Sequence, residues 1–392
     1  MKVSILTLAC FPEGMATTNR VVYHAKGLKE NGVDVDIIAV KPTEKYCTAS
    51  TTKNTIRSGE VKGVKFKYSV KSPIRSKYFI KRRIDDIFGP IYAAHTVVKN
   101  KCDAAMLISS NSFYHVMLFK LVFNFFRIKF IVERAELPFH GKKQHGIYKL
   151  KNYLYSKFIY KNLYGFLAIS EYLYDHYSKM TSKKTKMLLH PVIIDEKDIY
   201  RSEVPRTRNL VYTGPLYQIK DGIVTIIKAF NLIAKEFPET DLLLTGNIDN
   251  TPDKEAINKA VEEGGVKDRI VFKGFISRQE MIELLNSAAG LVLAKPSSEQ
   301  ADSCFPTKLG EYLSTSNPIV ITNTGEISLY LTNGVDAYIA EPDSVESFAN
   351  KIIELLSYPD KAKKIGEAGR NAALKNFNYL ELAKNVIDLI KG

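Results

Sequence analysis

The sequence predicts an α/β protein built from two successive Rossmann-like halves, each with a doubly wound parallel sheet. Short apolar runs alternate with segments of helical periodicity along the chain, and this alternation restarts after a polar segment at residues 195–208. The length of 392 residues, with 45% hydrophobic and 25% charged residues, is typical of two globular domains. We therefore expect domains at residues 1–200 and 201–375.

The first half opens with a βαβ unit. An apolar run at residues 3–8 predicts a buried strand, residues 17–31 have apolar side chains at helical spacing, and residues 35–40 predict the next strand. Because a crossover helix joins parallel strands, this unit predicts a parallel sheet. Further strands are expected at residues 64–70, 104–108, 130–132, 165–169 and 187–191, and helices at residues 115–126 and 148–164.

The second half repeats the alternation of strands and helices. Strands are expected at residues 210–212, 241–245, 270–272, 290–294 and 318–322. Helices are expected at residues 222–237, 258–263, 278–287, 307–314, 344–356, 361–377 and 379–391.

The formal net charge of +14 is unevenly distributed. Residues 1–200 hold 34 basic and 16 acidic side chains, whereas residues 201–392 hold 22 and 26. This distribution favours one basic face on the first domain over a nucleic-acid-binding surface that covers the whole chain.

The cysteines and the apolar segments indicate a cytoplasmic protein. Cys10, Cys47, Cys102 and Cys304 are widely spaced, which favours reduced thiols over a disulfide framework or a zinc site. The N-terminal apolar run is too short for a signal peptide, and no stretch reaches the ~20 uncharged apolar residues of a membrane-spanning helix. We expect a protein that is soluble or, at most, peripheral to a membrane.

In open parallel sheets, ligands bind beyond the carboxyl ends of the strands. We therefore expect the binding residues in the loops that follow the strands. Residues 213–222 run from a strand into a helix and include Gly214 and Lys220. Free N–H groups at a helix start and a lysine suit a phosphate, although an ordinary strand-to-helix turn is the alternative. After the strand at residues 270–272, Phe275 and Ile276 are candidates for nucleobase recognition, or simply an apolar strand end.

The loop with the most candidate ligand-binding residues precedes the helix expected at residues 307–314. Pro306 suits the first turn of that helix, and Thr307 and Lys308 expose N–H groups near its start. One turn further, the Glu311 carboxylate can accept two hydrogen bonds from a ribose diol; the alternative is a solvated helix residue.

The order of Gly214, Lys220, Gly274 and the segments PTKLGEYL and NPIV resembles the nucleotide-sugar half of family 4 glycosyltransferases. This resemblance implies the GT-B fold, in which two Rossmann-like domains face a central cleft. It also implies a C-terminal helix at residues 376–392 that crosses back to the first domain.

The resemblance further implies roles for individual residues. Lys220 would bind the donor diphosphate and Glu311 the nucleotide ribose, while the backbone at Pro306, Thr307 and Lys308 would cradle the diphosphate. Gly14 stands where the family has a glycine-rich opening loop.

The sequence departs from the family at the first glutamate of its E-x7-E motif. Ser303 occupies this position, and Asp302 or Glu299 are the candidates to replace its contacts to the sugar. Pro215 stands where the family usually has an arginine, a charge that Lys308 can supply.

The first half is expected to hold the acceptor. Glu133 and Arg134 follow a predicted strand, and His140 comes a few residues later; family members often have a catalytic histidine after such a strand. One of these side chains would orient the acceptor hydroxyl or receive its proton. The alternative is a structural ion pair between Glu133 and Arg134.

Two stretches of the first half mix basic residues with Tyr and Phe, at residues 71–83 and 142–164. This composition suits an anionic membrane surface better than RNA, because no RNA-binding motif is present. A solvated basic helix face is the third interpretation.

Together these features predict a bacterial glycosyltransferase that uses a nucleotide diphosphate sugar and needs no metal or other cofactor. The family resemblance implies that the enzyme is retaining. The expected acceptor is a lipid-linked glycan of surface polysaccharide synthesis (capsule, O-antigen or exopolysaccharide), at the inner face of the cytoplasmic membrane. The alternatives are a non-catalytic nucleotide- or glycan-binding protein and an NAD-dependent oxidoreductase, although the latter lacks GxGxxG.

Overall fold

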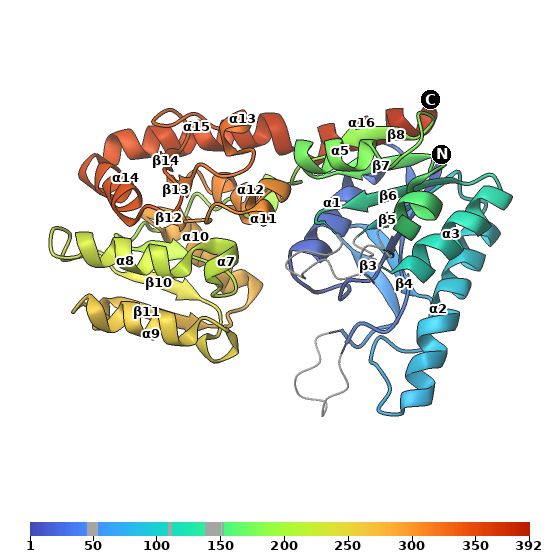
Figure 1. Cartoon of the computed structure of the whole chain (residues 1–392), viewed down its shortest axis with the longest axis horizontal. Helices are drawn as coiled ribbons and strands as arrows, with labels where there is room; N and C mark the ends of the chain where they lie inside the picture. Colours follow the sequence, from blue (N-terminus) through green and yellow to red (C-terminus); the bar gives the residue numbers. More distant parts are fainter. Residues whose placement is uncertain (45–53, 109–111, 138–149, 151–152) are drawn as a thin grey trace. The chain divides into compact units, whose positions relative to one another are not determined.

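The computed structural model describes residues 1–44, 54–108, 112–137, 150 and 153–392. The chain divides into unit 1, formed by Met1–Ile193 and Tyr379–Gly392, and unit 2, formed by Ile194–Asn378 (Figure 1). The expected boundaries after residues 200 and 375 therefore move by a few residues. The first moves because Glu196, in helix α6 (Glu196–Ile199), pairs within unit 2 with Arg370 of α15 (Pro359–Phe377) at 2.6 Å.

Unit 1 is organised around a sheet whose described strands follow the order β3-β4-β2-β1-β5-β6-β7-β8. All neighbours pair in parallel except β3 with β4. The central strands are buried on both faces, as their continuous apolar runs predicted. The strands are β1 (Lys2–Thr7), β2 (Asp34–Ala39), β3 (Ser58–Val61), β4 (Val64–Tyr68), β5 (Ala104–Ile108), β6 (Lys129–Arg134), β7 (Gly165–Ala168) and β8 (Lys186–Leu189).

Two helices of unit 1, α2 (Phe79–Lys99) and α5 (Glu171–Ser178), were not predicted from the sequence. Helix α2 has Gly89 and Pro90 in its interior, a pair that normally argues against a helix. Gly89 is needed because any Cβ there would collide with the carbonyl oxygen of Val40. The other described helices that precede residue 194 are α1 (Ala16–Glu30), α3 (Phe113–Phe125) and the π-helix η1 (Tyr155–Tyr160).

The C-terminal helix α16 (Tyr379–Lys391) completes the core of unit 1 (Figure 1). Its buried Val386 and Ile390 belong to the same apolar cluster as Val21 of α1. Gly27 of α1 allows the approach, since a Cβ at this position would lie 2.9 Å from Ala383 Cβ.

Unit 2 has a parallel sheet of described strands in the order β11-β10-β9-β12-β13-β14. The strand order reverses direction between β9 and β12, where the doubly wound architecture places ligands. The strands are β9 (Leu210–Tyr212), β10 (Leu242–Thr245), β11 (Ile270–Gly274), β12 (Gly290–Leu293), β13 (Ile319–Thr322) and β14 (Tyr338–Ala340). Besides α6 and α15, the described helices of unit 2 include α7 (Gln218–Asp221), α8 (Ile223–Ile233), α9 (Lys254–Glu263), α10 (Arg278–Ser287), α11 (Glu299–Ser303), α12 (Thr307–Ser314), α13 (Ile327–Tyr330) and α14 (Val345–Ser357).

Among the described helices of both units, none combines the length and the apolar character that crossing a bilayer requires.

Candidate functional site

Three glycines bring the carboxyl ends of β9, β10 and β11 together in unit 2. Gly214, Gly246 and Gly274 all have positive φ angles. The N–H of Gly246 donates to the carbonyl of Gly274 at 2.8 Å, and a Cβ on Gly246 would collide with the carbonyl oxygen of Gly214. The loops therefore meet backbone to backbone at this edge of the sheet.

Lys308 of α12 lies directly over Gly214. A Cβ on Gly214 would lie 2.5 Å from Lys308 Cε and 2.6 Å from its Nζ. Lys308 Nζ donates to Asp221 Oδ2 at 2.5 Å and to the hydroxyl of Tyr212 at 3.0 Å. Burial lowers the pKa of Lys308, and the Asp221 carboxylate opposes this shift. The predicted residues Gly214 and Lys308 are thus brought into contact.

Two further lysines belong to the same electrostatic environment. Lys220 is exposed in α7, where its charge disfavours the protonated form of Lys308. Lys295, two residues after β12, is 6% exposed. Burial lowers the pKa of Lys295, Asp221 opposes this shift, and Lys308 adds to it. We call Lys220, Lys295 and Lys308 the lysine cluster. Asp221 is its internal counter-ion.

Glu311, one turn after Lys308, is held by an arginine. Its Oε1 accepts a hydrogen bond from Arg278 NH1 at 2.7 Å, and both side chains are partly exposed. Because Arg278 begins α10, this pair connects α12 to the loop that follows β11. Glu311 is therefore oriented by an ion pair at the surface of unit 2, and its contact with a ribose stays a prediction.

The two residues predicted to recognise the nucleobase lie in different surroundings. Phe275 is 76% exposed. Ile276 lies in a shallow pocket with Val204 and Leu284. The two residues therefore do not form one continuous wall.

The remaining predicted donor residues lie around α11 and the start of α12. Pro306 is the N-cap and Thr307 the first residue of α12. Asp302 is exposed and its Oδ1 accepts from the N–H of Gly325 at 3.3 Å. Ser303 is fully buried, with its Oγ donating to the carbonyl of Gln300 at 3.3 Å, so it offers no carboxylate-like group to a sugar.

Glu133, a predicted catalytic residue, is a buried structural ion in unit 1. It is 1% exposed; Oε1 accepts from Arg20 Nε at 2.7 Å and Oε2 from His24 Nε2 at 2.6 Å. Burial raises the pKa of Glu133, but the charges of Arg20 and His24 outweigh this and hold it well below its usual range. An ionised carboxylate with both oxygens engaged cannot receive a proton from an acceptor, so this geometry contradicts the predicted proton transfer.

Arg134 does not pair with Glu133, because successive side chains of a strand point to opposite faces. It is 1% exposed and its charge interacts with Tyr155, Tyr160 and Tyr177. The alternative of a Glu133–Arg134 ion pair is therefore also wrong.

The last two predicted residues of the first half have different outcomes. His140 lies outside the described residues. Gly14 precedes α1, and a Cβ there would collide with Thr18 Oγ1 and lie 2.9 Å from the carbonyl oxygen of Cys10. The turn into α1 therefore requires a glycine.

Sequence analysis missed Tyr212, Asp221, Arg278 and Lys295. Lys295 had a detectable signal, since a lysine directly after an apolar strand lies at the ligand-binding edge. Asp221 follows Lys220, but its partner Lys308 is 87 residues away and pairs with it only through the fold. In the described part of the chain, no group of three or more His, Cys, Asp or Glu side chains is placed to hold a metal ion.

Residues 195–372 match the family model described as "Glycosyl transferases group 1". Unit 2 belongs to the glycosyl transferase group 1 family. The match confirms the predicted glycosyltransferase resemblance, and it decides against the oxidoreductase alternative.

Curated relatives match part of the chain at low identity. An uncharacterized glycosyltransferase, YqgM, of Bacillus subtilis is 23% identical over 53% of this chain and 56% of its own length. A GDP-mannose-dependent α-(1-6)-phosphatidylinositol monomannoside mannosyltransferase of Mycobacterium tuberculosis is 23% identical over 44% of this chain and 45% of its own length. The chain thus spans about half the length of the curated relatives it matches.

Solved structures resemble the whole chain. Sucrose-phosphate synthase from Thermosynechococcus elongatus aligns with a TM-score of 0.71 at 15% identity, over 100% of this chain and 98% of its own. HepE from Anabaena in complex with UDP and glucose aligns with a TM-score of 0.70 at 12% identity, over 100% of both chains. These likenesses confirm the predicted GT-B fold.

Proposed function

We propose that the protein is a retaining glycosyltransferase that moves a sugar from a nucleotide diphosphate sugar to a hydroxyl group of a lipid-linked glycan. The observation that carries this proposal is the lysine cluster at the carboxyl edge of the group 1 domain, where Lys308 is held over Gly214 by Asp221. A diphosphate is an anion that such a cluster binds. The complex of HepE with UDP and glucose and the GDP-mannose dependence of the mycobacterial relatives support a nucleotide-sugar donor.

In this proposal the donor diphosphate replaces Asp221 as the partner of Lys308. Lys220 and Lys295 then stabilise the negative charge that grows on the diphosphate as the sugar leaves. The N–H groups at the start of α12 contribute to the same task because the positive end of the helix dipole lies there. Glu311, oriented by Arg278, accepts hydrogen bonds from the ribose hydroxyls.

We further propose that the lysine side chains make a metal ion unnecessary, so that no cofactor takes part. The test is transfer measured with EDTA and with added Mg²⁺. Equal rates support the proposal, and a rate that depends on Mg²⁺ contradicts it.

The donor is tested by thermal shift of the purified protein with UDP-, GDP-, ADP- and CMP-sugars. We expect one nucleotide to stabilise the protein, and Lys308→Ala to reduce that shift strongly. Lys364→Ala, which removes a lysine of α15 remote from the lysine cluster, is the matched control. If none of these nucleotide sugars stabilises the protein, the proposed donor class is refuted.

The acceptor side of the proposal rests on α2 and its flanking residues. Ile80, Ile84, Ile87 and Ile91 recur at helical spacing, and each is at least 40% exposed. Arg82 and Lys81 lie next to them in sequence. Further large apolar side chains of unit 1 are exposed in the same helix and in or beside α3, namely Phe79, Phe88, Tyr92, Leu121, Phe125 and Phe126.

An amphipathic helix with isoleucines, aromatic residues and basic residues suits the interface of an anionic bilayer. The excess of 34 basic over 16 acidic side chains in residues 1–200 favours the same partner. We therefore propose that unit 1 associates with the inner face of a bacterial cytoplasmic membrane, where the enzyme glycosylates its acceptor during surface polysaccharide synthesis.

The membrane proposal is tested by co-sedimentation with vesicles of phosphatidylcholine alone or with phosphatidylglycerol. We expect binding to require phosphatidylglycerol, to weaken with salt, and to be lost in Ile84→Ser/Ile87→Ser and in Arg82→Glu/Arg83→Glu. Lys183→Glu/Lys184→Glu, which changes the same charge in an exposed segment after α5, should bind like the parent. Binding that ignores lipid charge, or that all three variants share, would contradict this site.

A non-catalytic protein that only binds nucleotides is the second candidate, and the buried Ser303 favours it. The decisive assay follows sugar release and product formation with acceptor. Nucleotide binding without transfer to any acceptor would favour this candidate.

A further inference from the structure

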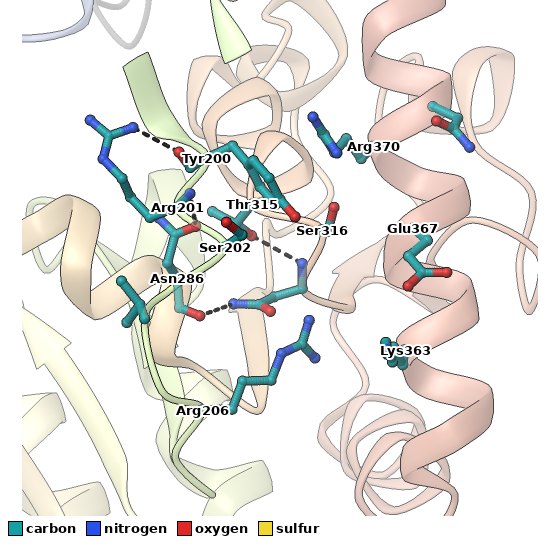
Figure 2. Close-up of a pocket in the computed structure, with 13 residues that line it drawn as sticks. Tyr200, Arg201, Ser202, Arg206, Asn286, Thr315, Ser316, Lys363, Glu367 and Arg370 are labelled. Atoms are coloured by element: carbon teal, nitrogen blue, oxygen red, sulfur yellow. Dashed lines mark hydrogen bonds between the residues drawn. The ribbon is translucent and has the colours of Figure 1, made fainter. Parts of the chain in front are cut away.

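A polar pocket of ≈ 510 Å³ lies in unit 2, far from the lysine cluster along the strand direction. It is lined by the segment Tyr200 to Arg206, by the turn of Thr315, Ser316 and Asn317, and by one face of α15 (Figure 2). The turn directly precedes β13, and Arg206 precedes β9. Because the strands are parallel, their amino ends share the edge opposite to the one that carries the lysine cluster. The volume falls within the range of about 300–1,000 Å³ typical of small-molecule sites.

The floor of this pocket is fixed by close packing. Ser316 has a φ of 62°, in the left-handed region, and a Cβ on Gly366 of α15 would collide with its carbonyl oxygen. Asn317 is 1% exposed, and its Nδ2 donates to the carbonyls of Leu285 at 2.7 Å and Asn286 at 3.0 Å. These two bonds fix which end of the amide is the oxygen.

The Oδ1 atom of Asn317 is buried and has no hydrogen-bond partner within the described residues. A buried acceptor of this kind destabilises the structure when nothing donates to it. This oxygen needs an O–H or N–H group as hydrogen-bond donor, and a ligand in the pocket would supply one.

Cationic side chains dominate the rest of the lining. Four of the lining residues are basic and only Glu367 is acidic, although residues 201–392 as a whole hold 22 basic and 26 acidic side chains. Arg206 reaches toward the α15 face that carries Lys363 and Glu367 (Figure 2). Within the part of the chain that the structure describes, the side chains of these three make no hydrogen bond or ion pair.

The other two basic residues are already engaged and give the pocket its shape. Arg370 NH2 pairs with Glu196 at 2.6 Å, and its guanidinium lies 4.0 Å from the ring centroid of Tyr200. Arg201 donates to main-chain carbonyls of residues 197, 198 and 200. Arg206 and Lys363 therefore remain to bind an anion.

We infer that this pocket is a second binding site, specific for a small anionic ligand that carries hydroxyl groups, of the class of sugar phosphates. Arg206 and Lys363 bind the phosphate through charge-assisted hydrogen bonds. The Oδ1 of Asn317 and the carboxylate of Glu367 accept from sugar hydroxyls. The site is independent of the proposed donor site, which uses the opposite edge of the sheet.

The experiment is isothermal titration of the full chain with glucose 6-phosphate, glucose and inorganic phosphate, in the presence of saturating UDP. We expect glucose 6-phosphate to bind and each of Arg206→Ala and Lys363→Ala to raise its Kd about tenfold or more. Both residues are exposed, so their removal leaves the fold intact. Arg208→Ala and Lys364→Ala, which remove neighbouring charges outside the pocket, should bind like the parent, as should Lys308→Ala.

Each outcome decides the inference. Failure of glucose 6-phosphate to bind, or binding that survives Arg206→Ala/Lys363→Ala, overturns the site. Inorganic phosphate binding as tightly as glucose 6-phosphate overturns the requirement for hydroxyl groups. Donor binding in Arg206→Ala/Lys363→Ala is the separate readout of the proposed function, and we expect it to equal that of the parent.

Discussion

Replacing Glu133 by Gln tests whether this residue is structural or catalytic. The substitution keeps the size of the side chain but removes the charge that balances Arg20. It also places an amide NH2 against either the Nε–H of Arg20 or the Nε2–H of His24. Breaking a buried ion pair in this way costs about 3–5 kcal/mol. The lower end applies here, because Arg20 keeps its 2.7 Å bonds to the carbonyls of Pro191 and His190.

The assay is urea unfolding followed by far-UV circular dichroism, since the chain has no tryptophan. With a urea m-value of about 2 kcal/mol per M, a loss of about 3 kcal/mol lowers the midpoint by about 1.5 M. The control is Glu262→Gln, which breaks the exposed pair of Glu262 with Lys267 and should cost less than about 1 kcal/mol. A midpoint for Glu133→Gln equal to that of the control would refute the structural assignment. Full stability with lost transfer would restore a catalytic role.

Three other predictions concern Arg278 and Asp221 in unit 2 and His115 in unit 1. Arg278→Ala should raise the KM for the donor about tenfold with kcat nearly unchanged, because Arg278 positions Glu311; an unchanged KM would rule out this role. Asp221→Asn should loosen Lys308 and reduce kcat/KM about tenfold or more, measured at saturating acceptor, and parental kinetics would contradict the counter-ion assignment. Burial lowers the pKa of His115 to about 4, whereas the unfolded chain titrates near 6.5. The unfolded state therefore binds more protons between these values, and stability should fall as the pH drops from 6.5 toward 4, by up to about 1.4 kcal/mol per pH unit. His115→Asn should make the urea midpoint depend less on pH between 6.5 and 4. The same dependence in the variant and the parent would contradict the role given to His115.

An element of this fold could be predicted when the residues that determine it are adjacent in the sequence. The strand at residues 104–108 was predicted with its exact bounds, because five buried apolar residues in a row have few alternatives. Helix α2 was missed because Gly89 and Pro90 weaken the local signal, while the reason for Gly89 is a contact with Val40, far away in sequence.

The same distinction applies to the candidate site. Gly214, Lys220 and Glu311 were found from loops that follow strands, a local pattern. The partners that decide what a charged residue does are distant: Arg20 is 113 residues from Glu133, and Asp221 is 87 residues from Lys308. The sequence pattern thus identified the charged residues, but only the fold separates a buried structural carboxylate from one poised at a ligand edge.

The place of α16 in the core of unit 1 has a consequence for synthesis on the ribosome. Residues 379–391 are made only after all of Ile194–Asn378, so α1 lacks its apolar cover while the whole of unit 2 is being translated. The unit that comes second in the chain is therefore the first whose core is complete. In nascent unit 1, Tyr23 of α1 therefore lacks its apolar neighbours Tyr379 and Leu382 until α16 has been synthesised and packs against Gly27.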